Sequence, residues 1–449
     1  MNPRWTLAAS VAGAVVVALD GTVLTVAQPS LQRELHATYA GVQWTSTAYL
    51  VAVASLLVFA GRLGDRYGQR RVFALGMLGF GAVSAGIGLA PTVGWVIGLR
   101  AVQGVFGALL QPATLGMLRA AYPADRLATP LAVRTGAIGL AAAAGPLIGG
   151  ALVSGLGWRA VFFVNVLPAL AFGLPALLRP QGRPAAVGTP LDLPGAVLLA
   201  VTLACAVHTL AVRPVSPAGA VAALVTAAAL VRHERRAASP LLPPEVIGSR
   251  AVAAGLGILV AVSASLFGGL FAANYVLQRR LGLDAFDSAL RSLPLAVLMI
   301  FSAAACPALL RRFGARATTA AATALLSLGV LVLSGVTAAP ALACGFALLG
   351  AGFGTVMVAA TQVIVRQADV KVAGVAGGLQ QTALNVGPAV GVAAATALLD
   401  AGTGPALLAL AAVAALGVPL AWALPASDGV APPTPTAGQR VHNGVPAGR

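Results

Sequence analysis

Hydrophobic residues along this chain form a series of long runs separated by short polar segments. The first run extends from Trp5 to Leu31 and contains a single charged residue, Asp20. The runs have about the 20 residues that a helix needs to cross the hydrocarbon core of a bilayer. Because lipid cannot hydrogen-bond to the backbone, each run is predicted to be helical. The pattern therefore predicts an all-α polytopic membrane protein.

We place fourteen membrane-spanning helices along the chain. Their predicted ranges are 6–27, 42–60, 72–90, 93–117, 131–154, 159–178, 194–212, 215–231, 251–276, 287–309, 316–336, 339–365, 375–399 and 404–424. We expect two six-helix bundles, residues 1–180 and 249–425, joined by a linker, residues 181–248, that carries the seventh and eighth helices as an inserted hairpin. Residues 426–449, rich in Pro, Gly and Thr, are predicted to be a disordered cytoplasmic tail.

Glycine spacing indicates an internal repeat. The intervals are 39 and 77 residues from the first member in the set Gly68, Gly107 and Gly145, and 40 and 73 residues in the set Gly314, Gly354 and Gly387. Three glycines at similar spacing in both halves predict two related bundles. The position in the second half that corresponds to Asp20 is Leu266, so we expect any coupling chemistry in the first half.

Composition and charge support a membrane protein and exclude other classes. The chain is 59% hydrophobic and 9% charged, unlike a soluble globular domain. Its net charge of +16 could indicate nucleic-acid binding, but the distribution indicates topology, with 21 basic residues on the predicted cytoplasmic side and six outside. We therefore expect a multi-pass protein of the inner (plasma) membrane with both termini cytoplasmic and no nucleic-acid partner.

Asp20 is the only acid that lies well inside a predicted span. An acid at this depth costs at least ~2.5–3.5 kcal/mol, so it normally faces a cavity or a partner and indicates an ion or proton pathway. Arg100 is the only base that we place inside a span rather than at its end, and Gln103 follows one helical turn later. We predict that Asp20 lies on an ion or proton pathway and that Arg100 relays protons to it. For each, the alternative is a side chain that reaches the membrane surface.

The loop between the second and third spans is short and contains several glycines and arginines. It reads Gly61-Arg-Leu-Gly-Asp-Arg-Tyr-Gly-Gln-Arg-Arg71. Glycine permits a tight turn and close helix packing, and Asp65 can pair with arginines or face the positive N-terminus of a helix in the other bundle. We predict a cytoplasmic latch between the bundles. The alternative is an incidental acid in a basic loop.

Glycines and a proline in the predicted fifth span let this helix bend and pack close to a neighbour, at a hinge or a bundle interface. These residues are Gly145, Pro146, Gly149 and Gly150. Polar residues that could line a substrate cavity are Thr25, Gln28, Gln103, Asn274, Gln362, Gln381 and Asn385. Hydrogen bonding between helices is the alternative role for most of them. Trp44 and Tyr49 are predicted to anchor the second span at the membrane surface.

These motifs resemble those of the major facilitator superfamily. Its loop signature G-x-L-x-D-R-x-G-x-R-R is met at Gly61, Leu63, Asp65, Arg66, Gly68, Arg70 and Arg71. Three further segments are similar to the fourteen-span drug:proton antiporter family: Leu19-Asp20-Gly21-Thr22-Val23 with Pro29 in the first span, Arg100, Gln103 and Gly104 in the fourth, and Gly145-Pro146 to Gly150 followed by Trp158-Arg159 and Asn165. That family usually has other residue types at Thr25, Gln28 and Ala141.

The resemblance implies a major facilitator fold and a proton-coupled antiporter that exports small hydrophobic drugs, dyes or antibiotics by alternating access. We expect a monomer with no cofactor, driven by the proton-motive force, whose partners are protons, the lipid bilayer and a neutral or monocationic substrate. The charge limit rests on Asp20, because a dication would leave a second charge unpaired.

Other function classes remain to be distinguished. The main alternative is a proton symporter or facilitator that imports a small solute, and a membrane receptor or scaffold without transport is a third possibility. An enzyme or primary pump is not expected, since the chain has no H-E-x-x-H motif, no P-loop and no nucleotide domain. Its three cysteines lie in apolar runs, so neither a disulfide framework nor a metal site is predicted.

Overall fold

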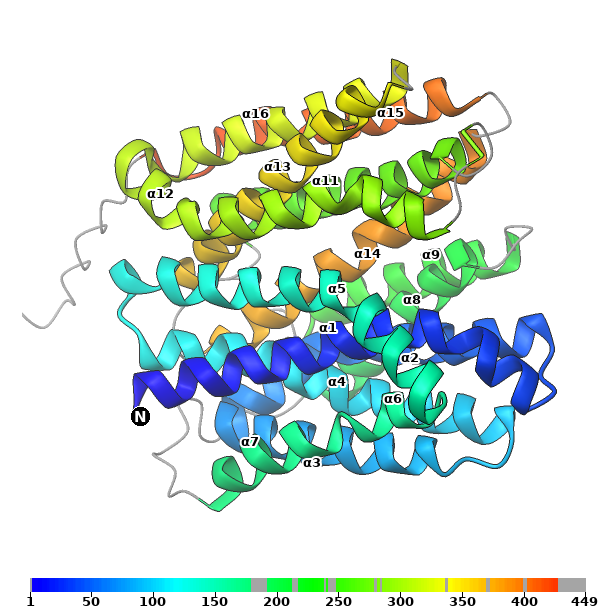
Figure 1. The fold of residues 1–449 in the computed structure, drawn as a ribbon. Helices are drawn as coiled ribbons and strands as arrows, with labels where there is room; N and C mark the ends of the chain where they lie inside the picture. The colour runs from blue at the N-terminus through cyan, green and yellow to red at the C-terminus, as the bar shows by residue number, and fades with distance from the viewer. Residues whose placement is uncertain are drawn as a thin grey trace, which may run out of the picture.

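The computed structural model describes residues 2–178, 192–211, 217–237, 240, 248–277, 281–282, 285–335, 338–368, 372–398 and 402–426. These residues are helical, with no strand among them (Figure 1). The first helices are α1 (Pro3–Glu34), α2 (Tyr39–Tyr67), α3 (Gln69–Gly88), α4 (Val93–Ala121), the short 3₁₀ helix η1 (Ala124–Arg126), α5 (Ala128–Leu156), α6 (Ala160–Phe163) and α7 (Val166–Leu178). The later helices are α8 (Leu193–Ala211), α9 (Pro217–Glu234), α11 (Arg250–Tyr275), α12 (Ala285–Gly335), α13 (Ala339–Gln367), α14 (Ala373–Leu398), α15 (Thr403–Ala415) and α16 (Gly417–Ala421).

The helices form two groups, one above the other in Figure 1. Helices α1 to α7 make up the lower group, and α11, α12, α13, α15 and α16 make up the upper group. Helix α14 packs against α11 of the upper group and also against α2 and α4 of the lower group. We call α1 to α7 the first half and α11 to α16 the second half. Helix α8 lies beside this contact, where Val58, Ala196 and Val375 of α2, α8 and α14 share a hydrophobic cluster.

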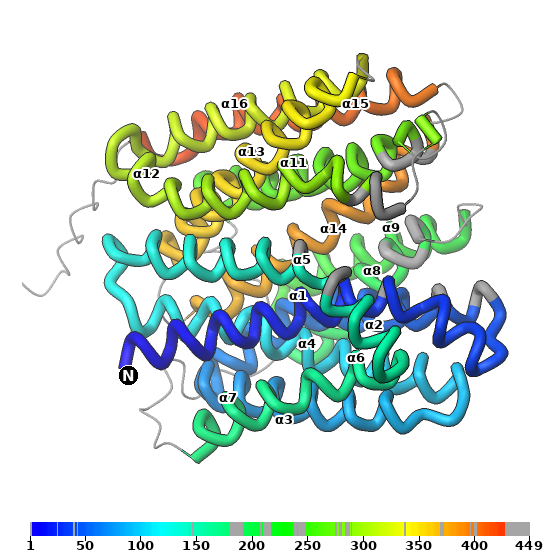
Figure 2. The backbone as a smooth tube through the Cα atoms, in the orientation of Figure 1, coloured from blue at the N-terminus to red at the C-terminus, as the bar shows by residue number. Residues whose placement is uncertain are grey.

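Nine helical segments within the described residues are long and apolar enough to cross a membrane. Helix α12 has 51 residues and would be about 75 Å long if straight, more than twice the hydrocarbon thickness. It consists of two limbs, because the backbone at Gly314 has a φ of 76° and the chain turns back there (Figure 2). The predicted spans at 287–309 and 316–336 correspond to these limbs.

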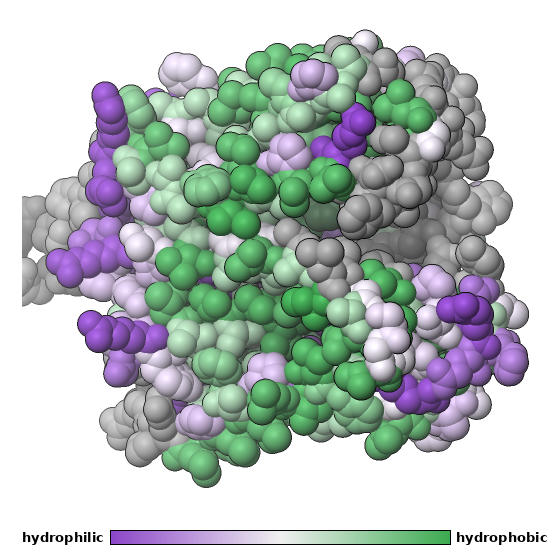
Figure 3. All heavy atoms as spheres, in the orientation of Figure 1, coloured by the Kyte–Doolittle hydropathy of each residue, from purple (hydrophilic) through white to green (hydrophobic). Residues whose placement is uncertain are grey.

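Surface hydropathy agrees with a membrane-spanning arrangement. In Figure 3 a broad hydrophobic surface lies between hydrophilic residues at the left and right of the molecule. The helices run between these two ends. Helix α2 turns into α3 at the left end of the molecule (Figure 1), and we call it the α2–α3 end. Most of the predicted tail, residues 427–449, lies outside the described residues.

The recurring glycines occupy equivalent places in the two groups. Gly145 packs α5 against α1, and Gly387 packs α14 against α11, each so closely that an added Cβ atom would overlap a neighbour. Gly68 and Gly314 lie where one helix turns into the next, with φ values of 96° and 76°. Only glycine adopts such values without steric cost. The repeat seen in the spacing is thus a repeat of helix contacts.

Candidate proton-coupling site and contacts between the halves

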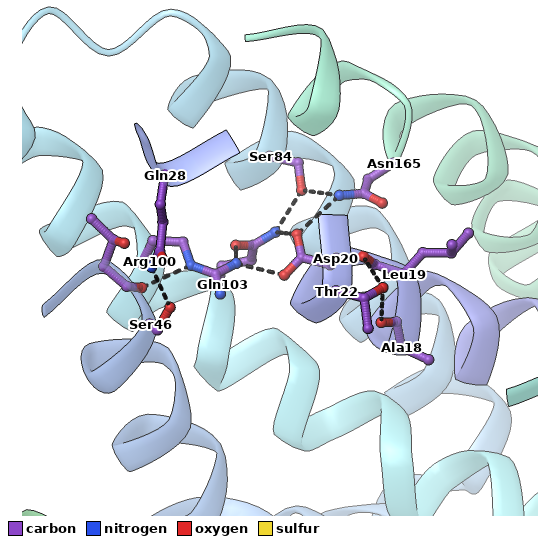
Figure 4. Close-up of polar contacts among 11 residues, drawn as sticks. Ala18, Leu19, Asp20, Thr22, Gln28, Ser46, Ser84, Arg100, Gln103 and Asn165 are labelled. Atoms are coloured by element: carbon purple, nitrogen blue, oxygen red, sulfur yellow. Dashed lines mark hydrogen bonds and ion pairs between the residues drawn. The ribbon is translucent and has the colours of Figure 1, made fainter. Parts of the chain in front are cut away.

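The carboxylate of Asp20 is buried in the middle of α1 and is bound by side chains from other helices (Figure 4). Nη1 of Arg100 on α4 lies 2.5 Å from Oδ2. Nε2 of Gln103 and Nδ2 of Asn165 each donate to Oδ1 over 3.1 Å. All four residues are at most 4% exposed. Arg100 and Gln103 reach the same acid because residues three apart share one face of a helix.

Arg100 has further partners on α2. Its Nε donates to the backbone carbonyl of Thr45 over 3.0 Å, and its Cζ lies 4.3 Å from the centroid of the Tyr49 ring. This distance permits a cation–π interaction. Tyr49 is only 5% exposed, so its predicted role as a surface anchor is wrong, whereas Trp44 is 40% exposed. Arg100 is therefore held by α2 even without the carboxylate.

Ser84 on α3 is a member of this site that sequence reasoning missed. Its Oγ accepts hydrogen bonds from Nε2 of Gln103 over 2.7 Å and from Nδ2 of Asn165 over 3.4 Å. Both amides thus bridge Asp20 and a buried hydroxyl, which fixes their orientation. A serine among alanines and glycines gives no signal in the sequence. Asn165 was noted there only through its resemblance to a family motif.

The predicted fifth-span motif packs α5 against α1 beside Asp20. A Cβ atom at Gly145 would overlap the side chain of Thr22, and one at Gly149 would lie 2.9 Å from Cγ1 of Val23. Oγ1 of Thr22 donates to the carbonyls of Ala18 and Leu19 over 3.1 Å. These glycines therefore act within the first half, whereas a Cβ at Gly150 would meet nothing within 4 Å. The side chain of Pro146 lies outside the described residues.

Asp65 joins α2 to the start of α14 in the other half. Its Oδ1 accepts from the backbone N–H of Gly374 over 2.8 Å, and its Oδ2 accepts from that of Val375 over 3.1 Å. Nε2 of Gln69 also donates to Oδ1, over 2.7 Å. A carboxylate at a helix N-terminus is stabilised by the unpaired N–H groups and the helix dipole. The sequence left two possible partners for Asp65, arginines or a helix N-terminus. Among the described residues, its backbone hydrogen bonds go to the helix N-terminus.

The backbones of α2 and α14 touch beside this contact. A Cβ atom at Gly61 would overlap the carbonyl of Gly374, and the reverse holds for Gly374. At Gly378, a Cβ would lie 2.6 Å from the carbonyl oxygen of Leu57. In the turn that follows, Gly68 has a positive φ, and the guanidinium of Arg66 lies over the Tyr67 ring. Only glycine permits the close approach of α2 and α14 at Gly61, Gly374 and Gly378.

Other contacts between the halves also lie toward the α2–α3 end. Nε of Arg119, near the end of α4, donates to the carbonyl of Val365 over 3.1 Å. Nε2 of Gln381 on α14 donates to Oε1 of Gln111 on α4. Gly139 on α5 faces Met299 on α12. The described contacts therefore close the molecule at this end.

The predicted cavity residues occupy several different places. Gln103 belongs to the Asp20 site, Gln381 bridges the halves, and Nδ2 of Asn385 donates to the Gln381 carbonyl over 2.7 Å. Nε2 of Gln28 donates to Ser46 over 3.0 Å within the first half. Gln362 is buried on α13. The side chains of Thr25 and Asn274 lie outside the described residues.

Arg134 is a second base buried within a helix, which corrects the prediction that Arg100 is the only one. It lies on α5, is 2% exposed, and its Nε has no hydrogen-bond partner among the described residues. No ion pair joins it to an acid in the described part of the chain. The charge count placed Arg134 on the cytoplasmic surface because it lies near the start of a predicted span.

Comparison with known proteins shows the family of this chain. The profile of the Major Facilitator Superfamily matches residues 11–392. The tetracenomycin C resistance and export protein of Streptomyces glaucescens is 38% identical, over 90% of this chain and 77% of that protein. A puromycin resistance protein of Streptomyces alboniger is 32% identical, over 94% and 89%. A multidrug efflux pump of Mycolicibacterium smegmatis is 33% identical, over 84% and 77%.

Solved structures share the fold at lower sequence identity. The human organic anion transporter MFSD10 superposes with a TM-score of 0.72 at 16% identity, covering 94% of this chain and all of that one. The proton:xylose symporter XylE superposes with a TM-score of 0.62 at 14% identity, covering 94% and 95%. At these identities the likeness shows the fold alone.

Proposed function

The chain belongs to the major facilitator superfamily, and from this premise we propose that it is a proton-coupled antiporter that exports small hydrophobic drugs, dyes or antibiotics. It is a multi-pass membrane transporter and not an enzyme. Support for export comes from relatives that cover nearly the whole chain and are named as resistance, export or efflux proteins. Support for proton coupling comes from the buried pair of Asp20 and Arg100.

The pair provides two charge states that a buried site can tolerate. With Asp20 ionised, Arg100 and two amides compensate its charge. When Asp20 takes up a proton, Arg100 keeps the Thr45 carbonyl and the Tyr49 ring. We propose that a proton and the substrate bias one conformational equilibrium in opposite directions, as antiport requires.

Alternating access would then use the contacts between the halves. In this conformation the α2–α14 contact at Asp65 and the neighbouring glycines closes the α2–α3 end. Opening of that end requires Asp65 to leave the start of α14. We propose that residues 61–71 are the latch that stabilises the closed state, since both oxygens of Asp65 bind the other half.

The finer topology is also a proposal. We propose fourteen spans, with α8 and α9 as a hairpin inserted between bundles 1–180 and 249–425. The packing of α8 and α9 against each other supports a hairpin. The charge count supports a cytoplasmic α2–α3 end and cytoplasmic termini in the inner membrane. We further propose a monomer that needs no cofactor beyond the proton-motive force.

The Asp20 site also bears on substrate charge. We propose that the substrates are neutral or monocationic compounds, as expected from the sequence. Because Arg100 already pairs with Asp20, a neutral compound needs no counter-charge, whereas a monocation has to compete with Arg100 or bind when the pair is broken. Neutral compounds are therefore the simpler substrates for the conformation described.

Transport in vesicles tests this function. Purified protein is reconstituted with a fluorescent hydrophobic substrate and an imposed pH gradient. We expect substrate to move against its gradient as protons move down theirs, and Asp20→Asn to abolish this movement. Asp125→Asn serves as the control, since Asp125 is an exposed acid on η1. Movement of substrate and protons in the same direction would support the symporter instead, and undiminished active efflux by Asp20→Asn would exclude the coupling role.

A further inference from the structure

A groove of about 410 Å³ lies between α5 and α12, where the two halves meet. Figure 1 shows these helices side by side on the face turned to the viewer. One wall includes Ala132, Val133 and Gly136 of α5, and the other includes Ala304 and Ala308 of α12. Val133 is 47% exposed, so the groove opens to the outer surface of the molecule.

Small residues at helical spacing keep this groove open. On α5 the lining residues recur after three or four positions, which places them on one face. A Cβ atom added at Gly136 would lie 4.0 Å from Cγ2 of Ile300, so the glycine leaves space between the walls. In a membrane such a surface is in contact with acyl chains rather than water.

One end of the groove carries a positive charge. Arg311 lines it and lies near the end of the first limb of α12, three residues before the turn at Gly314. It is exposed and has no hydrogen bond or ion pair within the described residues. Since the turn lies at the α2–α3 end, Arg311 is placed at headgroup depth, on the side predicted to be cytoplasmic.

We propose that this groove binds one phospholipid with an anionic headgroup. An acyl chain would lie along the small apolar residues, and the phosphate would pair with Arg311. Basic pockets between spanning helices on the cytoplasmic side bind such headgroups, because anionic lipids are enriched there. The site combines both required features, an apolar groove between spanning helices and, at its end, a cation that has no partner in the part of the chain that the structure describes.

The site depends on the conformation of the transporter. Its two walls belong to different halves, so the groove exists only while α5 and α12 approach each other at the α2–α3 end. A ligand that binds one state shifts the equilibrium toward that state. Bound anionic lipid therefore stabilises the conformation described, closed at the α2–α3 end.

Lipid binding to the purified full chain tests this proposal without a transport assay. Native mass spectrometry compares phosphatidylglycerol with phosphatidylcholine of the same acyl chains. We expect Arg311→Gln to weaken phosphatidylglycerol binding roughly fivefold, the order expected for one basic residue near an anionic surface. Arg312→Gln is the matched control, because Arg312 is the adjacent base, lies over the Phe313 ring and does not line the groove. It should bind like the wild type.

A second variant tests the apolar part of the site. Gly136→Leu fills the groove and should weaken binding of both lipids, whereas Arg311→Gln should affect only the anionic one. Equal binding of phosphatidylglycerol by the wild type and Arg311→Gln would overturn the proposal. So would wild-type binding by Gly136→Leu, or no preference of the wild type for the anionic lipid. None of these outcomes bears on whether the protein exports drugs.

Discussion

Asp20 and Arg100 compensate each other in a place where either charge alone would be costly. Removal of one partner from a buried pair typically costs about 3–5 kcal/mol. Arg100 retains the Thr45 carbonyl, Gln103 and the Tyr49 ring. We therefore expect Asp20→Asn to fold, with a loss of stability near the lower limit of this range. In Arg100→Gln, the carboxylate of Asp20 keeps only its two amide donors, Gln103 and Asn165.

The double variant Asp20→Asn/Arg100→Gln should recover much of the stability lost in either single variant, because neither charge is then left alone. Thermal unfolding of the four purified proteins completes a double-mutant cycle. Losses that simply add in the double variant would show that the two side chains do not stabilise each other.

Arg134 is buried without a compensating charge among the described residues, so its removal should stabilise the protein. We expect Arg134→Met to raise the free energy of unfolding by about 1–4 kcal/mol, the range found when a buried ion pair is replaced by apolar residues of similar size, because the change likewise removes a desolvated charge. Arg119→Met is a suitable comparison, because Arg119 donates to Val365 and its loss should destabilise. A lower midpoint of thermal unfolding for Arg134→Met would indicate a partner that this conformation does not show.

The contact of α5 with α1 depends on glycine at particular positions. Gly145→Val should force the helices apart at Thr22 and cost about 1–3 kcal/mol, as overpacking usually does. Gly150→Val, in the same motif, should be tolerated because its Cβ would meet open space. Thermal unfolding and efflux are measured for both. If the two variants lose stability equally, close packing is not the reason for the motif.

The contact of α2 with α14 should control conformation more than affinity. Asp65→Asn removes the charge at the start of α14 and should weaken the closed state by about 0.3–1 kcal/mol, a two- to fivefold change in population. Gly68→Leu should have a similar effect, since the turn requires positive φ. Substrate binding and transport are measured separately in each variant. Equal loss of both would point to a folding role.

Substrate charge follows from the charges that the molecule as a whole buries. Asp20 is already paired, and the other buried acid described, Asp65, lies at the α2–α3 end. Export of a neutral or mono-quaternary compound should therefore exceed export of the matched bis-quaternary compound, because an unpaired charge in a low dielectric costs several kcal/mol. Resistance of a pump-deficient host to such pairs provides the measurement. Strong efflux of the dication would point to another reachable acid, with Asp287 and Asp400 the first to substitute.

The sequence by itself determined the class of fold and the residues that had to be explained. Each helix in lipid satisfies its own backbone hydrogen bonds, so helices can be read from local hydrophobic runs. A carboxylate such as Asp20 is conspicuous in such a run. The loop at Asp65 and the glycine spacing are also local patterns, and the structure finds equivalent helix contacts at those glycines.

Only the tertiary structure decided which side chains meet. Asn165 bonds to Asp20 across 145 residues and to Ser84 across 81, and nothing local shows which face of an almost wholly apolar helix turns inward. Tyr49 had the sequence position of a surface anchor but stacks on Arg100, because the rotation of α2 places it there. The burial of Arg134 likewise follows from α5 packing between the halves. Rotation and packing depend on the whole bundle, whereas helix formation depends on each segment alone.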